Sequence, residues 1–160
     1  MTQTFSGGCQ CGAVRFSATD PFEPAICHCR MCKKAFGSPL AALVDCKPEN
    51  VEWTRGKPSY FKSSDAVRRG FCGECGTPLS YEHRDGIELA ICAFDEPDKL
   101  APTHQVNHSA RRAWFDTLDQ LPPDDEAAYA EHQDSLKNFQ HPDRDTEDWP
   151  PEFWFTADHF

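Results

Sequence analysis

Seven of the nine cysteines in this 160-residue chain fall in three tight groups, and their spacing constrains the fold more than any other feature. The groups are Cys9-Gln10-Cys11-Gly12, Cys27-His28-Cys29-Arg30-Met31-Cys32 and Cys72-Gly73-Glu74-Cys75-Gly76. An odd number of cysteines cannot all pair within one chain, and residues 1–6 lack the basic and apolar stretches of an export signal. We therefore interpret the groups as metal ligands or reactive thiols, and expect a cytoplasmic protein whose thiols stay reduced.

The first and last groups are typical of zinc-binding knuckles. A short turn between two cysteines lets both sulfurs approach one point at about 2.3 Å, and glycine allows the positive φ that the turn needs. One such group holds two ligands, whereas a structural zinc takes four. Together the two groups supply a tetrahedral four-sulfur site, formed by Cys9, Cys11, Cys72 and Cys75. Zinc bound there would tie the N-terminal strand to a later hairpin, so that its binding energy becomes folding energy.

The middle group contains three cysteines, Cys27, Cys29 and Cys32. Three thiolates can surround a metal but are one ligand too few to close a tetrahedron, and His28 would point away from a metal bound by both of its neighbours. Three protein ligands with a vacant position are typical of a catalytic zinc. Two alternatives remain open. Either Cys46, Cys92 or a distant histidine completes a structural site, or the cysteines form a redox dithiol.

The first 115 residues predict a mainly β structure of short strands. Apolar and polar residues alternate from Ala13 to Ala18, and the run Pro39–Cys46 is apolar on both faces, as in a central strand. Further strands are expected at 51–53, 59–62, 79–83 and 87–93, with Asp85-Gly86 as a hairpin turn. Short strands separated by frequent turns favour an all-β architecture of small sheets.

Other thiol, imidazole and basic side chains are weaker candidates for function. We expect Cys46 and Cys92 to be small buried hydrophobic residues rather than nucleophiles. His104 and His108 could supply a general base or a partner to a metal ligand, although surface histidines are the commoner outcome. Basic side chains concentrate in two pairs, Lys33 with Lys34 and Arg68 with Arg69. Either pair could hold a substrate carboxylate or lower a thiol pKa, and a solvated surface is the alternative.

The formal net charge of −10 is distributed unevenly along the chain. Residues 1–115 carry 14 basic and 13 acidic side chains, whereas residues 116–160 carry 2 and 13. We therefore divide the chain into a zinc-binding β domain, 1–115, and an acidic C-terminal extension, 116–160. The acidity argues against nucleic acid or an anionic membrane as a partner, and no apolar run is long enough for a transmembrane helix.

The extension predicts one short helix and an aromatic end. Prolines and acidic residues at the start favour a helix from about Asp124 to Phe139, although its apolar stripe is thin. The aromatic segment 149–155 is expected to pack on the body or on a second subunit, which makes a homodimer worth testing. A mobile tail is the alternative.

The motifs together resemble one protein family. The succession GGCQCGAVRF, CHCRMCKKAFG, VEWTRGKPSYFKSS, RRGFCGECGTPL and a late PTHQV…W, from about Gly7 to Trp114, is similar to the glutathione-dependent formaldehyde-activating enzymes, which include the centromere protein V type. The resemblance implies an Mss4-like fold of small coiled antiparallel sheets around a structural zinc. It implies two Zn²⁺ per chain, a structural ion on Cys9, Cys11, Cys72 and Cys75 and a catalytic ion on Cys27, Cys29 and Cys32.

The resemblance also implies a carbon–sulfur lyase-type activity, the addition of glutathione to formaldehyde that gives S-hydroxymethylglutathione. We therefore predict a zinc enzyme that acts on a small-molecule thiol and a carbonyl substrate, or on their adduct. Three thiolates give a zinc site a net charge of −1, which weakens its Lewis acidity. The alternatives are a zinc-stabilised binding module without catalysis and a thiol redox enzyme that uses Cys46 or Cys92.

Overall fold

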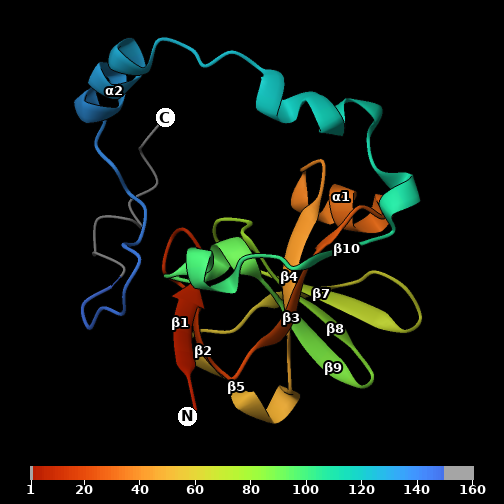
Figure 1. The fold of residues 1–160 in the computed structure, drawn as a ribbon. Helices are drawn as coiled ribbons and strands as arrows, with labels where there is room; N and C mark the ends of the chain where they lie inside the picture. Colours follow the sequence, from red (N-terminus) through yellow and green to blue (C-terminus); the bar gives the residue numbers. More distant parts are fainter. Residues whose placement is uncertain (1, 150–160) are drawn as a thin grey trace.

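The structure is a computed structural model that describes residues 2–149 and places the ten strands of these residues in two sheets (Figure 1). The smaller sheet has the order β1 (Thr4–Gly8), β2 (Arg15–Thr19), β5 (Val51–Arg55). The larger sheet has the order β10 (His104–Val106), β3 (Phe22–Cys27), β4 (Ala41–Cys46), β9 (Gly86–Ala90), β8 (Pro78–His83), β7 (Val67–Phe71), β6 (Ser59–Lys62). Neighbouring strands are antiparallel except β10 and β3, which are parallel. The predicted mainly β, Mss4-like fold is confirmed.

Helices connect and flank the sheets. The α-helices are α1 (Arg30–Phe36) and α2 (Glu126–Ser135). The 3-10 helices span Pro48–Asn50, Ile91–Ala93, Pro97–Leu100, His108–Ala110 and Ala113–Gln120. Within residues 2–149, none of the helices combines the length and the apolar character needed to cross a bilayer.

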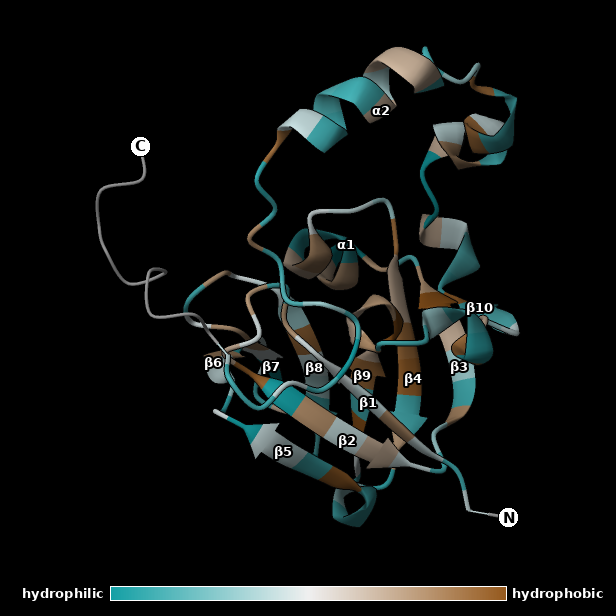
Figure 2. Cartoon of the chain, turned by 90° about the vertical axis from the view of Figure 1, so that its left-hand side faces the viewer, coloured by the Kyte–Doolittle hydropathy of each residue, from teal (hydrophilic) through white to brown (hydrophobic). Residues whose placement is uncertain are grey.

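The hydrophobic core joins the two sheets. Phe16 of β2 is fully buried and packs edge-on against Phe94, with 4.9 Å between ring centroids, in one cluster with Leu89 of β9. Gly7 of β1 lies so close to this core that a Cβ would stand 2.4 Å from the carbonyl oxygen of Ala93. Glycine is therefore required where the smaller sheet meets the chain that leaves the larger one. Brown, apolar stretches of β2 and β4 mark the core-forming strands in Figure 2.

Helix α1 is absent from the sequence-based expectation. It has only seven residues, and its N-cap is Cys29, whose Sγ accepts a hydrogen bond from the Cys32 N–H at 3.3 Å. A thiol in this position is not among the usual capping residues, so the helix start carries no conventional signal. The helix ends at Gly37, whose φ of 58° is the left-handed conformation that glycine adopts readily.

The C-terminal extension leaves the body and then returns to it. Helix α2 is exposed along its length and ends at Ser135, four residues before the predicted end, because little apolar surface holds a further turn in place. The chain then comes back to the loop between β1 and β2 (Figure 1), where the His141 N–H donates to the Gln10 carbonyl at 2.7 Å. Trp149 donates through Nε1 to the Cys11 carbonyl. Most of the predicted aromatic end, 150–155, lies outside the described residues.

Candidate metal centres and the adjoining cavity

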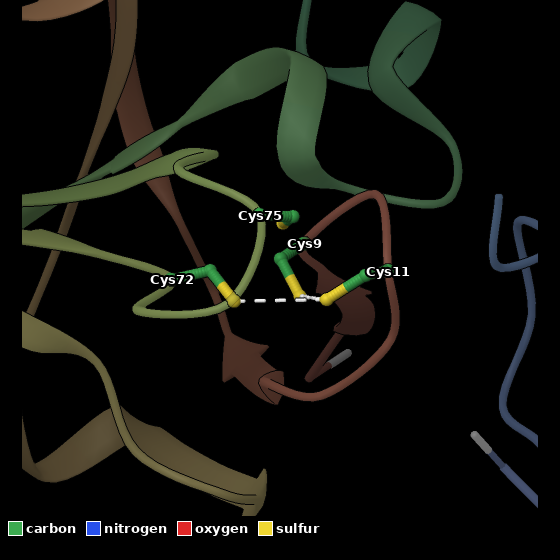
Figure 3. Close-up of side chains that lie close together, drawn as sticks. All are labelled: Cys9, Cys11, Cys72 and Cys75. Atoms are coloured by element: carbon green, nitrogen blue, oxygen red, sulfur yellow. Dashed lines mark hydrogen bonds between the residues drawn. The ribbon is translucent and has the colours of Figure 1, made fainter. Parts of the chain in front are cut away.

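The four-cysteine cluster consists of Cys9, Cys11, Cys72 and Cys75, which lie close together in Figure 3. The first two belong to the β1–β2 loop of the smaller sheet, and the last two to the β7–β8 loop of the larger sheet. Each loop turns at a glycine with positive φ, 73° at Gly12 and 79° at Gly76. The N–H groups of these glycines donate to the Cys9 and Cys72 carbonyls at 2.9 Å, which closes each turn as predicted for a knuckle.

The sulfur atoms of this cluster have the spacing that a tetrahedral metal requires. Cys11 Sγ lies 3.4 Å from Cys9 Sγ and 3.7 Å from Cys72 Sγ, and all four sulfurs are within 4.8 Å of one another. A zinc ion at about 2.3 Å from four sulfurs places them about 3.8 Å apart. The donor set therefore fits Zn²⁺.

Burial and hydrogen bonds shift the thiol pKa values of the four-cysteine cluster. Burial raises the pKa of Cys72 to about 11 and also raises that of Cys11. Burial acts in the same direction on Cys75, but hydrogen bonds from Thr77 lower its pKa to about 7. Buried thiols this close together cannot all ionise unless a cation compensates their charge.

The three-cysteine cluster consists of Cys27, Cys29 and Cys32. It is formed by a single junction, because Cys27 ends β3, Cys29 caps α1 and Cys32 lies in the first turn of the helix. The three sulfurs lie within 4.8 Å of one another, and no fourth cysteine, histidine or carboxylate of residues 2–149 joins them. The set fits three ligands of a tetrahedral ion and leaves the fourth direction to another molecule.

His28 is directed away from this cluster, as expected. Its side chain is fully buried, and Nε2 lies 2.8 Å from Oε1 of Gln105. The ring also packs edge-on against Phe115, with 4.9 Å between centroids. His28 therefore holds β10 and the following chain against β3 rather than serving as a ligand.

Two side-chain donors face the sulfurs of the three-cysteine cluster. Arg69 donates through Nη2 to Cys32 Sγ at 3.5 Å, and Asn107 donates through Nδ2 to Cys27 Sγ at 3.8 Å. Burial raises the pKa of Cys32 to about 12, although Arg69 opposes the shift. Burial also acts to raise the pKa of Cys29, but hydrogen bonds from the helix N-terminus bring it below its ordinary value. These donors would stabilise thiolates on a bound metal.

The three-cysteine cluster opens on a cavity of about 400 Å³ with a line of polar side chains along its wall. The strand register places Arg69 of β7 opposite Tyr81 of β8, Tyr81 opposite Glu88 of β9, and Glu88 opposite Asp45 of β4. Residues directly opposite one another point to the same face of a sheet, and all four line the cavity. We name these four residues the polar row.

Two carboxyl groups stand side by side in the polar row. Burial and the charge of Asp45 raise the pKa of Glu88 to about 7, and burial with the charge of Glu23 raises the pKa of Asp45. The His83 imidazole lies within 4.8 Å of both carboxyl groups. Like charges this close favour a shared proton, so the pair can bind or release a proton near neutral pH.

The other thiols and imidazoles predicted as candidates lie outside both clusters. Cys46 is buried, and burial raises its pKa to about 12, which confirms the prediction of a small buried residue. Cys92 is exposed, so the same prediction for it is wrong. The chain leaves the sheet after Ala90, and the alternation that would have buried Cys92 ends there. His104 and His108 are exposed, and His104 lines the cavity.

The basic pair in β7 is divided between two environments. Arg68 is largely exposed and pairs with Glu82 at 2.6 Å, whereas Arg69 is 6 % exposed and lines the cavity. A solvated surface is therefore the right interpretation for the first arginine and the wrong one for the second. The other three members of the polar row are not among the residues predicted from the sequence. The available signal was Glu88, an acidic residue inside the otherwise apolar run 87–93.

The fold and the clusters define a mainly β protein with two cysteine sites that could bind metal ions. Residues 4–110 match the family model described as glutathione-dependent formaldehyde-activating enzyme, and the chain belongs to this family.

One known protein is similar to the chain in sequence, and another has a similar fold. A Schizosaccharomyces pombe protein described as an uncharacterized lyase is 32 % identical over 114 residues, which is 59 % of this chain and 82 % of the relative. A Rhodobacter sphaeroides protein of known crystal structure shares the fold at a TM-score of 0.53 and 18 % identity, covering 63 % of this chain and 99 % of its own. Family membership and the lyase relative support a lyase-like function.

Proposed function

We propose that this protein is a zinc-dependent carbon–sulfur lyase that joins a small-molecule thiol to a small aldehyde, or cleaves the resulting adduct. The family description supplies glutathione and formaldehyde as the first pair to test. The observation that carries the proposal is the three-cysteine cluster, which offers three sulfur ligands and opens on a cavity. Three protein ligands leave one position for a substrate, which is the arrangement of a catalytic zinc.

The proposal gives the two clusters different roles. The four-cysteine cluster holds a structural zinc, and the three-cysteine cluster holds a catalytic zinc, so the chain carries two Zn²⁺ ions. When bound, the second ion would hold a thiol as its thiolate or polarise a carbonyl oxygen. Arg69 and Asn107 offset part of the thiolate charge by donating hydrogen bonds to two of the sulfurs.

The cavity wall sets a condition on the thiol substrate. Three carboxylic acids, Glu23, Asp45 and Glu88, line the cavity. Among the same lining residues there is one arginine, Arg69. A thiol with net negative charge, such as glutathione, meets more carboxyl groups than cations here. The neutral 2-mercaptoethanol and the cationic cysteamine therefore belong beside glutathione in any assay of the thiol.

The test is the rate of adduct formation between ¹³C-formaldehyde and each thiol, followed by exchange NMR against the uncatalysed rate. We expect acceleration by the zinc-loaded wild-type protein with at least one thiol. Cys29→Ser should abolish the acceleration, whereas Cys46→Ser, which alters a buried thiol outside both clusters, should retain it. A wild-type protein with two zinc ions and no acceleration in either direction would overturn the proposal and leave a zinc-stabilised binding module.

Compartment and partners are part of the same proposal. We place the protein in the cytoplasm, where thiolate ligands escape oxidation, and expect neither nucleic acid nor a membrane as a partner. The aromatic C-terminus makes a homodimer worth testing, and sedimentation of the full chain would test it.

A further inference from the structure

Arg69 carries a hydrogen-bond donor that the rest of the described chain leaves unused. The side chain is 6 % exposed, and its Nη1 is buried with no acceptor in residues 2–149. Buried polar groups are nearly always paired, and a buried charged donor without an acceptor is costly. The same guanidinium lines the cavity beside the three-cysteine cluster. An acceptor is therefore expected from a molecule in the cavity.

The other contacts of Arg69 hold the guanidinium in place. Its Nε donates to Ser63 Oγ at 3.1 Å, and Nη2 donates to Cys32 Sγ at 3.5 Å. The guanidinium carbon lies 4.8 Å from the centre of the Tyr81 ring. With two nitrogens engaged and one face against a ring, the free nitrogen is preorganised next to the sulfurs.

The proposed reaction has a need for such a donor. When a thiolate sulfur adds to an aldehyde, the sulfur–carbon bond forms and the carbon–oxygen π bond breaks. The electron pair of that bond moves to the oxygen, which becomes an alkoxide. A site with three thiolates is itself anionic and is poorly suited to stabilise this second negative charge. A cationic donor fixed beside the sulfurs can supply that stabilisation.

We propose that Arg69 binds the substrate oxygen through Nη1 and that Glu88, two places along the polar row, carries the proton of the reaction. This inference rests on the proposed function. During the addition reaction, the Glu88 carboxylate takes the proton of the substrate thiol and then gives it to the alkoxide oxygen. Thiol and aldehyde become a hydroxyalkyl thioether, Glu88 is regenerated, and no further reactant is needed. Cleavage of the adduct runs through the same steps in reverse.

The surroundings of Glu88 suit this exchange. Asp45 and Tyr81 flank it on the neighbouring strands, and Arg69 follows Tyr81 along the row. His83 is within 4.8 Å, and His104 and Glu23 line the same cavity. A pKa of about 7 lets the carboxyl group accept and release a proton at neutral pH.

The first experiment measures binding without turnover. Calorimetry compares mercaptoacetate, which carries a carboxylate oxygen close to its thiol, with ethanethiol, which has no oxygen, on the zinc-loaded protein. Arg69→Met should weaken the binding of mercaptoacetate by about 10-fold or more relative to the binding of ethanethiol. Arg69→Lys should retain part of the preference for mercaptoacetate. Arg68→Met is the matched control, because the preceding arginine is exposed and pairs with Glu82. Zinc content and melting temperature of each variant identify any general loss of structure.

The second experiment measures the reaction. Arg69→Met should lower kcat by about 100-fold with little change in the thiol KM, as removal of an oxyanion donor does. Glu88→Gln should lower kcat/KM by about 100-fold and remove the rise of kcat/KM with pH that a Glu88 pKa of about 7 predicts for the wild type. Glu82→Gln is the control, since this carboxylate pairs with Arg68 and does not line the cavity of the three-cysteine cluster.

The outcomes separate this inference from the proposed function. An active wild type with equal effects of Arg69→Met and Arg68→Met in both experiments would overturn the inference and leave the lyase proposal standing. An inactive wild type with an Arg69-dependent preference for mercaptoacetate would overturn the lyase proposal and the proton role of Glu88 but support the oxygen site. A third equivalent of zinc, lost in Glu88→Gln, would show that the carboxyl pair binds metal and would overturn its role in proton transfer.

Discussion

The two cysteine clusters have the same chemistry but different positions in the chain. The four-cysteine cluster draws its cysteines from loops of two different sheets, about sixty residues apart in sequence, and three of its four side chains are buried. The three-cysteine cluster takes its cysteines from six consecutive residues at one strand–helix junction, and two of the three side chains are only partly buried. Metal in the four-cysteine cluster would link distant parts of the fold, whereas metal in the three-cysteine cluster would link residues that are already neighbours in the chain.

The largest expected effect is a difference in stability between two variants, one in each cysteine cluster. Cys72→Ser should prevent stable folding, because a structural zinc contributes on the order of 10 kcal/mol, comparable with the whole stability of a domain. Cys29→Ser should fold with one zinc instead of two and lose only the metal of the three-cysteine cluster. Thermal unfolding and elemental analysis of both proteins provide the measurement. Equal destabilisation by the two substitutions would show that both clusters are structural.

Stepwise metal removal tests the same comparison without mutation. A chelator should take the first zinc from the partly exposed three-cysteine cluster while the circular dichroism of the sheets is unchanged. Loss of the second zinc should coincide with unfolding, because its four ligands join the two sheets. A chromophoric chelator and circular dichroism recorded together follow both steps. Simultaneous release of both ions would contradict the assignment.

A smaller effect concerns a second link between the sheets. Arg15 of β2 is 3 % exposed and forms an ion pair at 2.6 Å with Asp95, which lies in the chain after β9 of the larger sheet. Asp95→Ala should cost about 3–5 kcal/mol of unfolding free energy, because it removes the buried one of the two carboxylate partners of a buried guanidinium. The control is Asp145→Ala, which removes the exposed partner of the same arginine and should cost at most about 1 kcal/mol. Urea unfolding at constant zinc measures both. A cost for Asp95→Ala as small as that of the control would leave the metal as the main link.

The smallest predicted change is a gain in stability at the cavity. The pKa of Glu88 is about 7 in the folded protein and about 4.3 in an unfolded chain. The free energy of unfolding therefore decreases as pH rises between these two values. Glu88→Gln removes this penalty and should be more stable than the wild type by at least about 1 kcal/mol at pH 8.5. The difference should vanish near pH 4 and below, where Glu88 is protonated in both states. A difference independent of pH would show that titration of Glu88 is not its cause.

Several elements of the fold could be predicted because their signals are local. The apolar run ending at Cys46 forms a strand between β3 and β9, and the segments around Asp85-Gly86 form the β8–β9 hairpin. The helix in the extension exists but is shorter than predicted, and α1 was missed because a cysteine provides its cap. The predicted strand 87–93 includes Cys92, whereas the strand ends two residues earlier, at Ala90. These errors occur where a hydrogen bond or a packing contact decides where an element ends.

The sequence by itself determined the cysteine groups, because the cysteines of each group are close in the chain and their turns depend on a few neighbouring residues. Only the tertiary structure decided what surrounds those ligands. Arg68 and Arg69 are adjacent in sequence, yet alternation along β7 exposes the first and buries the second beside Cys32. The polar row depends on the register between four strands, and a shift of one residue in a single strand would turn its member to the opposite face. Register is set by the packing of the whole sheet, and no segment of the chain contains that information alone.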